Sequence, residues 1–115
     1  MMDLRASLSQ KAFNVFDDLR QNNQLCDVIL QANGQDFPAH RNILAACSPY
    51  FRALFTNGMN ETKETNVQLP DVDPQLFSLL LDYAYTREVK ITEENVEKIL
   101  PLADQFNVPG KLELK

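Results

Sequence analysis

The stretch from residue 36 to residue 55 reads DFPAHRNILAACSPYFRALF, and its interpretation decides the fold. It contains the only histidine of the chain, His40, and one of the two cysteines, Cys47, between two aromatic-rich apolar runs. A helix is expected to begin near His40, just after Pro38. Ser48-Pro49 predicts the start of a second helix, because serine caps helix N-termini and proline suits the first helical position.

His40 is the one side chain here that could act as a general base near neutral pH. Ser48 follows eight residues later, but Pro49 marks it as a helix cap rather than a nucleophile. The chain has only three glycines, and it has no GxSxG turn, phosphate-binding glycine loop or HExxH helix. The sequence therefore predicts a non-enzymatic protein with a structural histidine. A small hydrolase built on His40 is a formal alternative.

The two cysteines predict neither a metal site nor a disulfide. Cys26 and Cys47 form no CxxC pair, and a single histidine cannot complete a usual structural zinc site with them. We expect reduced thiols that behave as small buried apolar groups, and Asp27 disfavours a thiolate at Cys26. No cofactor is expected.

Composition narrows the class of partner. The chain has 115 residues with 44% hydrophobic content, which predicts one domain. Its net charge is −5 and its eleven basic residues are scattered, which argues against nucleic acid. No apolar run approaches the roughly 18 residues of a membrane span, and the N-terminus lacks the apolar core of a signal peptide. We expect a cytoplasmic protein, with a nuclear location as an alternative, that binds another protein.

A first helix is predicted within residues 7–24, SLSQKAFNVFDDLRQNNQ. Ser7 or Ser9 could cap its start, and residues 21–23 read as its end. Apolar side chains recur at helical spacing on one stripe. These are Leu8, Ala12, Val15, Phe16 and Leu19, with Phe13 flanking them. Such a stripe on a peripheral helix suits either core packing or an interface between identical subunits.

The remaining elements follow from turn and cap signals. Asn33-Gly34 predicts a type I′ hairpin, and Asp27 is expected to accept local hydrogen bonds. Asp73-Pro74 opens a helix over residues 74–86 that is apolar on nearly every face and should be buried. Thr92 precedes another helix, ENVEKIL.

Two short strands and one break complete the expected elements. The strands are VQL, residues 67–69, and EVKI, residues 88–91. Pro101 is expected to bend or split the last helix near Leu100.

Met59 stands alone in the polar connector of residues 56–72. Its side chain is either turned inward or offered to a partner. From the residues alone, the inward orientation is slightly favoured.

These features together resemble a BTB/POZ domain, in the version found at the N-terminus of Kelch-like proteins. The resemblance runs from about residue 8 to the C-terminus. It implies an α+β fold in which a helical cluster is capped by a small mixed β-sheet. We expect a single BTB/POZ domain over residues 1–115, with residues 1–7 as an N-terminal extension and without the BACK and Kelch regions. The matching stretches are CDVIL, FPAHRNILAACSPYFRALFT and LLLDYAYTREVKITEENVEKILPLADQFNV.

The resemblance also implies a homodimer. Domains of this family pair through the first helix, often with an exchanged N-terminal strand. It nominates as dimer contacts Leu8, Ala12, Phe13, Phe16 and Leu19.

Kelch-like proteins bind the N-terminal domain of cullin-3 and act as substrate adaptors of a ubiquitin ligase, with substrates held by the Kelch propeller. Many carry a hydrophobic residue, any residue, then Glu after the third helix, and Met59-Asn60-Glu61 fits that pattern. The resemblance therefore implies cullin contacts at Met59, Glu61, Tyr50 and Tyr85. The alternative within the same fold is the BTB domain of a transcriptional regulator that recruits corepressors through the dimer groove.

Overall fold

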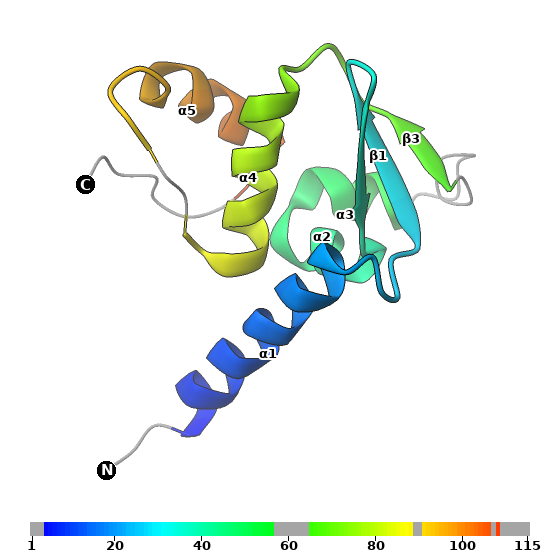
Figure 1. Ribbon diagram of the computed structural model, residues 1–115, viewed down its shortest axis with the longest axis vertical. Coiled ribbons are helices and arrows are strands. Elements are labelled where there is room, and N and C mark those ends of the chain that lie inside the picture. Colours follow the sequence, from blue (N-terminus) through cyan, green and yellow to red (C-terminus); the bar gives the residue numbers. More distant parts are fainter. Residues whose placement is uncertain (1–3, 57–64, 89–90, 107, 109–115) are drawn as a thin grey trace.

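The computed structural model describes residues 4–56, 65–88, 91–106 and 108, with side chains from residue 8 onward. Five helices and three strands are assigned within these ranges, and Figure 1 shows a small sheet beside a group of helices. The helices are α1 (Leu4–Gln21), α2 (Arg41–Cys47), α3 (Pro49–Thr56), α4 (Pro74–Thr86) and α5 (Val96–Gln105). The strands are β1 (Val28–Ala32), β2 (Gln35–Ala39) and β3 (Asn66–Gln68).

The sheet is mixed, with strand order β2-β1-β3. β1 and β2 pair antiparallel, with Val28 opposite Ala39, while β3 pairs parallel to β1. Asn33 and Gly34 have φ of 45° and 87°, as a type I′ turn requires. The predicted hairpin and the predicted short strand near VQL are both confirmed.

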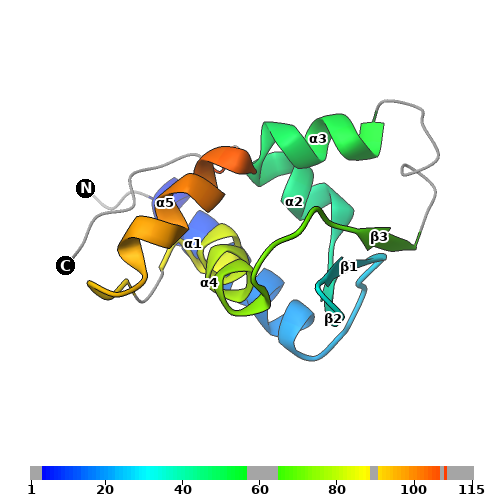
Figure 2. The same cartoon turned by 90° about the horizontal axis from the view of Figure 1, so that it is seen from above.

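α4 lies at the centre of the helical cluster, between α5 and the sheet (Figures 1 and 2). Asp73 accepts hydrogen bonds from the N–H groups of Gln75 and Leu76, so the predicted cap is confirmed. Phe77 of α4 packs edge-on against Phe37 of β2 and Phe106 at the end of α5. The expectation of a central, buried helix is therefore confirmed.

The last helix differs from the prediction. α5 runs through Pro101 without interruption, so the helix does not split there, and the alternative of a bend near Leu100 stays a prediction. Proline removes one backbone donor, but Ile99 and Leu102 on either side are buried and hold both halves of the helix against the core. Thr92 and Asn95 exchange side-chain-to-backbone hydrogen bonds of 3.2 and 2.9 Å ahead of the helix, a reciprocal cap that agrees with Thr92 as a start signal.

Two further elements depart from the sequence predictions or cannot be fully compared with them. α1 begins at Leu4, before the serines that were candidate caps, because Leu, Arg and Ala are good helix formers. Glu88 and Ile91 are not in a strand, and residues 89–90 of the expected EVKI strand lie outside the described residues. In the described part of the chain, no helix has the length and apolar character needed to cross a membrane.

Candidate functional site

α1 presents apolar side chains in two directions. Phe13 and Phe16 pack edge to face, with ring centroids 5.7 Å apart, and rest against the core. Leu8 and Val15 are instead 65% and 53% exposed. Figure 1 shows the N-terminal half of the helix extending away from the body of the molecule. One face of α1 therefore stabilises the protomer, and another leaves apolar surface in solvent.

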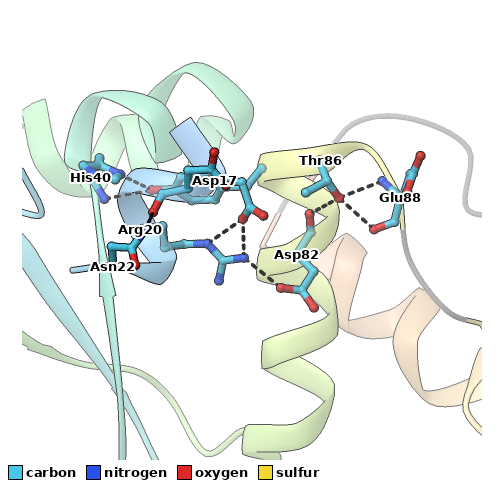
Figure 3. Close-up of polar contacts among 9 residues, drawn as sticks. Asp17, Arg20, Asn22, His40, Asp82, Thr86 and Glu88 are labelled. Carbon is cyan, nitrogen blue, oxygen red and sulfur yellow. Dashed lines mark hydrogen bonds and ion pairs between the residues drawn. The ribbon is translucent and has the colours of Figure 1, made fainter. Parts of the chain in front are cut away.

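Arg20 fixes the C-terminal half of α1 onto α4. Its Nη2 lies 2.7 Å from Oδ1 of Asp17 and 2.8 Å from Oδ1 of Asp82 (Figure 3). Its guanidinium carbon also lies 4.7 Å from the ring centroid of Tyr85. Burial alone would lower the pKa of Arg20, but the two carboxylates outweigh it and raise that pKa. This contact joins the C-terminal half of α1 to α4.

A groove of about 220 Å³ runs between α1 and α2. Its walls are apolar apart from one amide and one thiol. The lining residues are Phe13, Phe16, Asn42, Ile43, Ala46 and Cys47. The thiol of Cys47 is buried and donates to the carbonyl of Ala84 at 3.3 Å, and burial raises its pKa. The groove can therefore receive apolar side chains but offers no reactive thiolate.

His40 is buried, and its ring is held on both sides. Its backbone N–H donates to the hydroxyl of Tyr85 at 2.9 Å, so the hydroxyl proton is left for Nδ1, 2.7 Å away. Nε2 then carries the ring proton and donates to the carbonyl of Gln24 at 2.9 Å. This agrees with the structural histidine predicted from the sequence, which bonds to backbone at the start of α2.

Cys26 lies next to this histidine. Its Sγ is 3.6 Å from Nε2 of His40, and its side chain is half-buried. Burial and the neighbouring charge of Asp27 raise the pKa of the thiol, in agreement with the sequence argument. The Asp27 carboxylate also accepts the N–H of Arg41 at 2.8 Å, which supplies the N-terminal cap of α2.

A second surface is formed by α3 and the end of α5, which lie side by side in Figure 2. Tyr50 of α3 is half-buried, and its ring packs edge-on against Phe51 and Phe106 at 5.2 and 5.0 Å. Burial raises the pKa of its phenol group. The Ser48 hydroxyl donates to the carbonyl of Phe106, which ties the two helices together. Tyr50 thus lies on the boundary between α3 and α5.

Comparison with known proteins identifies this architecture. The profile of the BTB/POZ domain matches residues 16–114. The chain belongs to the BTB/POZ domain family. The BTB domain of zebrafish PATZ1 superposes with a TM-score of 0.79 at 28% identity, covering 90% of this chain and 83% of that one. The α+β fold predicted from the sequence, a helical cluster with a small mixed sheet, is confirmed.

Kelch-like proteins are among its similar relatives. Kelch-like protein 2 of Rattus norvegicus is 49% identical over 94 residues, which cover 82% of this chain. Kelch-like protein 3 of Homo sapiens is 50% identical over 93 residues, which cover 81% of this chain. In both cases the match covers 16% of the relative, so this BTB/POZ domain spans about one sixth of their length.

The nominated dimer residues fall on both faces of α1 in this BTB/POZ domain. Leu8 is exposed, Ala12 and Leu19 are half-buried, and the two phenylalanines line the groove beside α2.

The four residues nominated for cullin binding differ in their exposure to solvent, and two of them are not described. Tyr50 lies at a partly exposed position, whereas Met59 and Glu61 fall within residues 57–64, outside the described residues. Tyr85 is 0% exposed, so its nomination is corrected: its side chain serves the interior, where it bonds to His40.

Two features were missed by reasoning from the sequence. The Arg20–Asp82 contact joins residues 62 positions apart, and no local pattern marks such a pair. The α2 side of the groove was also missed, although Asn42 and Ala46 stand one helical turn apart in a helix whose other side is apolar.

Proposed function

We propose that this BTB/POZ domain is a homodimeric interaction module that binds the N-terminal domain of cullin-3 as the adaptor part of a cullin-RING ubiquitin ligase. The observation that carries the proposal is the identity of 49% to Kelch-like protein 2 over 82% of the chain. Adaptors act by holding two proteins together, which requires interaction surfaces rather than a reactive centre. Its location would be the cytoplasm or the nucleus.

The arrangement of the helices supports two simultaneous contacts. The exposed side chains of α1, Leu8 and Val15, offer apolar surface for a second copy. Tyr50 lies on α3, which is separated from α1 by α2 in Figure 2. A dimer formed through α1 would therefore leave α3 available to the cullin. Met59 and Glu61 follow α3 in the sequence, and the proposal assigns them to the cullin contact.

Calorimetric titration with the cullin-3 N-terminal domain tests the proposal. Wild-type chain should bind, and Met59→Asp should weaken binding about thirtyfold, since loss of an apolar anchor at an interface costs about 2 kcal/mol. Gln35→Asp is a matched control, because Gln35 is exposed on β2, away from α3. Light scattering of the wild type should give twice the 13.1 kDa mass of the chain. A wild-type dimer that shows no heat with the cullin domain would rule out the adaptor function.

The second candidate is a BTB domain that recruits a corepressor peptide through the groove beside α1. The apolar groove of about 220 Å³ favours it, and so does the likeness to the BTB domain of PATZ1, which carries no Kelch-like name. Ala46→Glu would place a carboxylate in that groove and leave the residues of α3 unchanged. If the groove is the working site, this variant loses peptide binding. If the protein instead binds the cullin through α3, the Ala46→Glu variant binds the cullin domain as tightly as the wild type does.

A further inference from the structure

A hollow of about 420 Å³ lies where the end of α1, strand β2 and helix α4 meet. Its volume falls in the range of roughly 300–1,000 Å³ that is usual for ligand sites. None of its lining residues lines the groove between α1 and α2, and none belongs to α3. The hollow is therefore separate from both surfaces on which the functions proposed above depend.

The hollow combines an apolar wall with hydrogen-bonding groups. The apolar residues of the wall are Phe37, Pro38 and Leu81. The neutral polar residues that line it are Gln21, Asn23 and Ser78. The side chains of these three polar residues make no hydrogen bond within the part of the chain that the structure describes. Apolar surface with a few polar groups that lack partners is typical of a binding site.

The charge at the hollow is negative. Arg20 and Asp82 both line it, and Arg20 also pairs with Asp17, so one positive and two negative charges give this group a net charge of −1. The Asp82 side chain is 44% exposed and accepts from Arg20 through Oδ1. Figure 3 shows its second oxygen turned away from Arg20. This arrangement favours a cationic ligand over an anionic one.

The acceptors on α4 suit arginine better than lysine. Ser78 and Asp82 stand four residues apart, so their side chains are neighbours on one face of the helix. The guanidinium of Arg20 is held by two carboxylates and by the ring of Tyr85, which fixes Oδ1 of Asp82. Two neighbouring acceptors match the planar fork of an arginine, whereas lysine offers a single ammonium group. The aliphatic stem of an arginine would lie on the apolar wall.

Strand β2 leaves a route to the hollow for an extended segment. The strand order is β2-β1-β3, so no other strand of the described sheet lies beyond β2. The net charge of −5 on the chain also attracts basic segments. We propose that this hollow binds an arginine side chain presented by an extended segment of a partner protein, with Asp82 and Ser78 as acceptors for its guanidinium group. The site is independent of the cullin contact proposed above.

Titrations of the isotope-labelled protein, followed by NMR, test the charge and shape of the ligand. The probes are the N-acetyl methylamides of arginine, lysine, citrulline and glutamate. The arginine compound should bind and shift the amide signals of Ser78 and Asp82. The citrulline compound has nearly the same shape without the charge, and it should bind about fivefold more weakly, as expected for the loss of one partly exposed ion pair.

The other two probes test the selectivity. The lysine compound should bind more weakly than the arginine compound, and the glutamate compound should not bind. The proposal is overturned if the citrulline or lysine compound binds as tightly as the arginine compound, or if the glutamate compound binds most tightly.

Two substitutions remove the acceptors one at a time. Asp82→Asn removes the charge while Arg20 keeps its bond to Asp17, and it should weaken binding of the arginine compound about fivefold. Ser78→Ala leaves the ion pairs in place and should weaken binding about threefold. Asp104→Asn is the matched control, because it removes the same charge at an exposed position of α5, and it should bind as the wild type does. Binding by Asp82→Asn at the wild-type affinity would overturn the proposal.

A third variant covers the structural role of Asp82. Since Asp82 also bonds to Arg20, circular dichroism melting curves show whether Asp82→Asn is folded. If it is not, Ser78→Leu decides, because it fills part of the hollow and keeps the ion pairs. Binding should be lost in folded Ser78→Leu, and binding that persists would show that the arginine compound lies elsewhere. A wild type that binds the cullin domain but not the arginine compound keeps the proposed function and lacks this site.

Discussion

The hydroxyl group of Tyr85 accepts the backbone N–H of His40 at 2.9 Å and lies 2.7 Å from Nδ1 of the same residue. One phenol oxygen thus joins the last turn of α4 to the start of α2, 45 residues away. Tyr85 is completely buried and His40 nearly so. The only histidine of the chain is therefore part of the framework that positions the helices, rather than a reactive group at the surface.

Tyr85→Phe should destabilise the fold without moving any helix. The ring still fills its site, but the N–H and Nδ1 of His40 lose their partner inside the protein. An unsatisfied buried polar group costs about 1–3 kcal/mol, which is a large part of the stability of a small domain. Chemical denaturation should show this loss as a lower midpoint with an unchanged slope.

Pairing this variant with His40→Ala separates the hydrogen bonds from the packing. If the two residues act as one unit, the double variant is less destabilised than the two single losses added together. Strict additivity would show that the hydroxyl and the imidazole stabilise the fold independently, which would contradict a shared hydrogen-bond network of Tyr85 and His40.

Alkaline pH should weaken the fold through the same phenol. Burial raises the pKa of Tyr85 above its ordinary value of 10.0. Above pH 10 the unfolded chain has therefore released a proton that the folded chain still holds, and stability falls as pH rises. Below pH 10 both states hold the proton, so the contribution there is constant.

Cys26, Cys47 and Tyr50 also have raised pKa values and act in the same direction, so the wild type alone cannot isolate Tyr85. The useful quantity is the difference in unfolding free energy between the wild type and Tyr85→Phe. It should shrink above pH 10 by up to about 1.4 kcal/mol per pH unit. A difference that stays constant from pH 9 to pH 11 would contradict the assignment.

Arg20→Met should loosen α1 from the body. The side chain of Arg20 is almost buried, but that of Asp82 is 44% exposed, so the ion pair is partly screened and its loss should cost only about 1 kcal/mol. Hydrogen exchange should become faster at amides of α1, with smaller changes in α4. In Arg20→Lys, exchange at the amides of α1 should be faster than in the wild type but slower than in Arg20→Met. Lysine keeps the positive charge but lacks the planar fork that reaches both carboxylates. Lys98→Met, at an exposed position of α5, is the control and should leave exchange in α1 unchanged.

Much of the fold follows from local signals in the sequence. The Asn33-Gly34 turn and the Asp73-Pro74 cap were predicted from residues next to one another, and both are present. Pro101 does not split α5, because Ile99 and Leu102 on either side of it are buried in the packed fold, and this burial opposes the local effect of the proline. Tertiary packing overrode a local preference there.

The candidate surfaces were predicted less completely for the same reason. The spacing of Leu8 and Val15 identifies an apolar stripe, but only the fold shows that this side of α1 is exposed while Phe13 faces the groove. Tyr85 matched a partner-binding position by its place in the sequence. Its side chain is instead buried on α4 beside His40, and this position determines its role. A single sequence contains no direct signal for contacts such as that between Arg20 and Asp82.

Tyr50→Ala should weaken binding of the cullin-3 N-terminal domain about tenfold while the dimer mass stays the same, since the ring lies partly exposed on α3, away from α1. The ring also packs against Phe51 and Phe106, so part of the loss could come from a shift of α3. Tyr50→Phe separates the two effects, because it keeps the packing and removes only the hydroxyl group. If the ring makes the contact, calorimetry should give Tyr50→Phe an affinity close to that of the wild type. If the hydroxyl group makes the contact, the affinity of Tyr50→Phe should be close to that of Tyr50→Ala. Full affinity in both variants would show that Tyr50 makes no contact with the cullin domain.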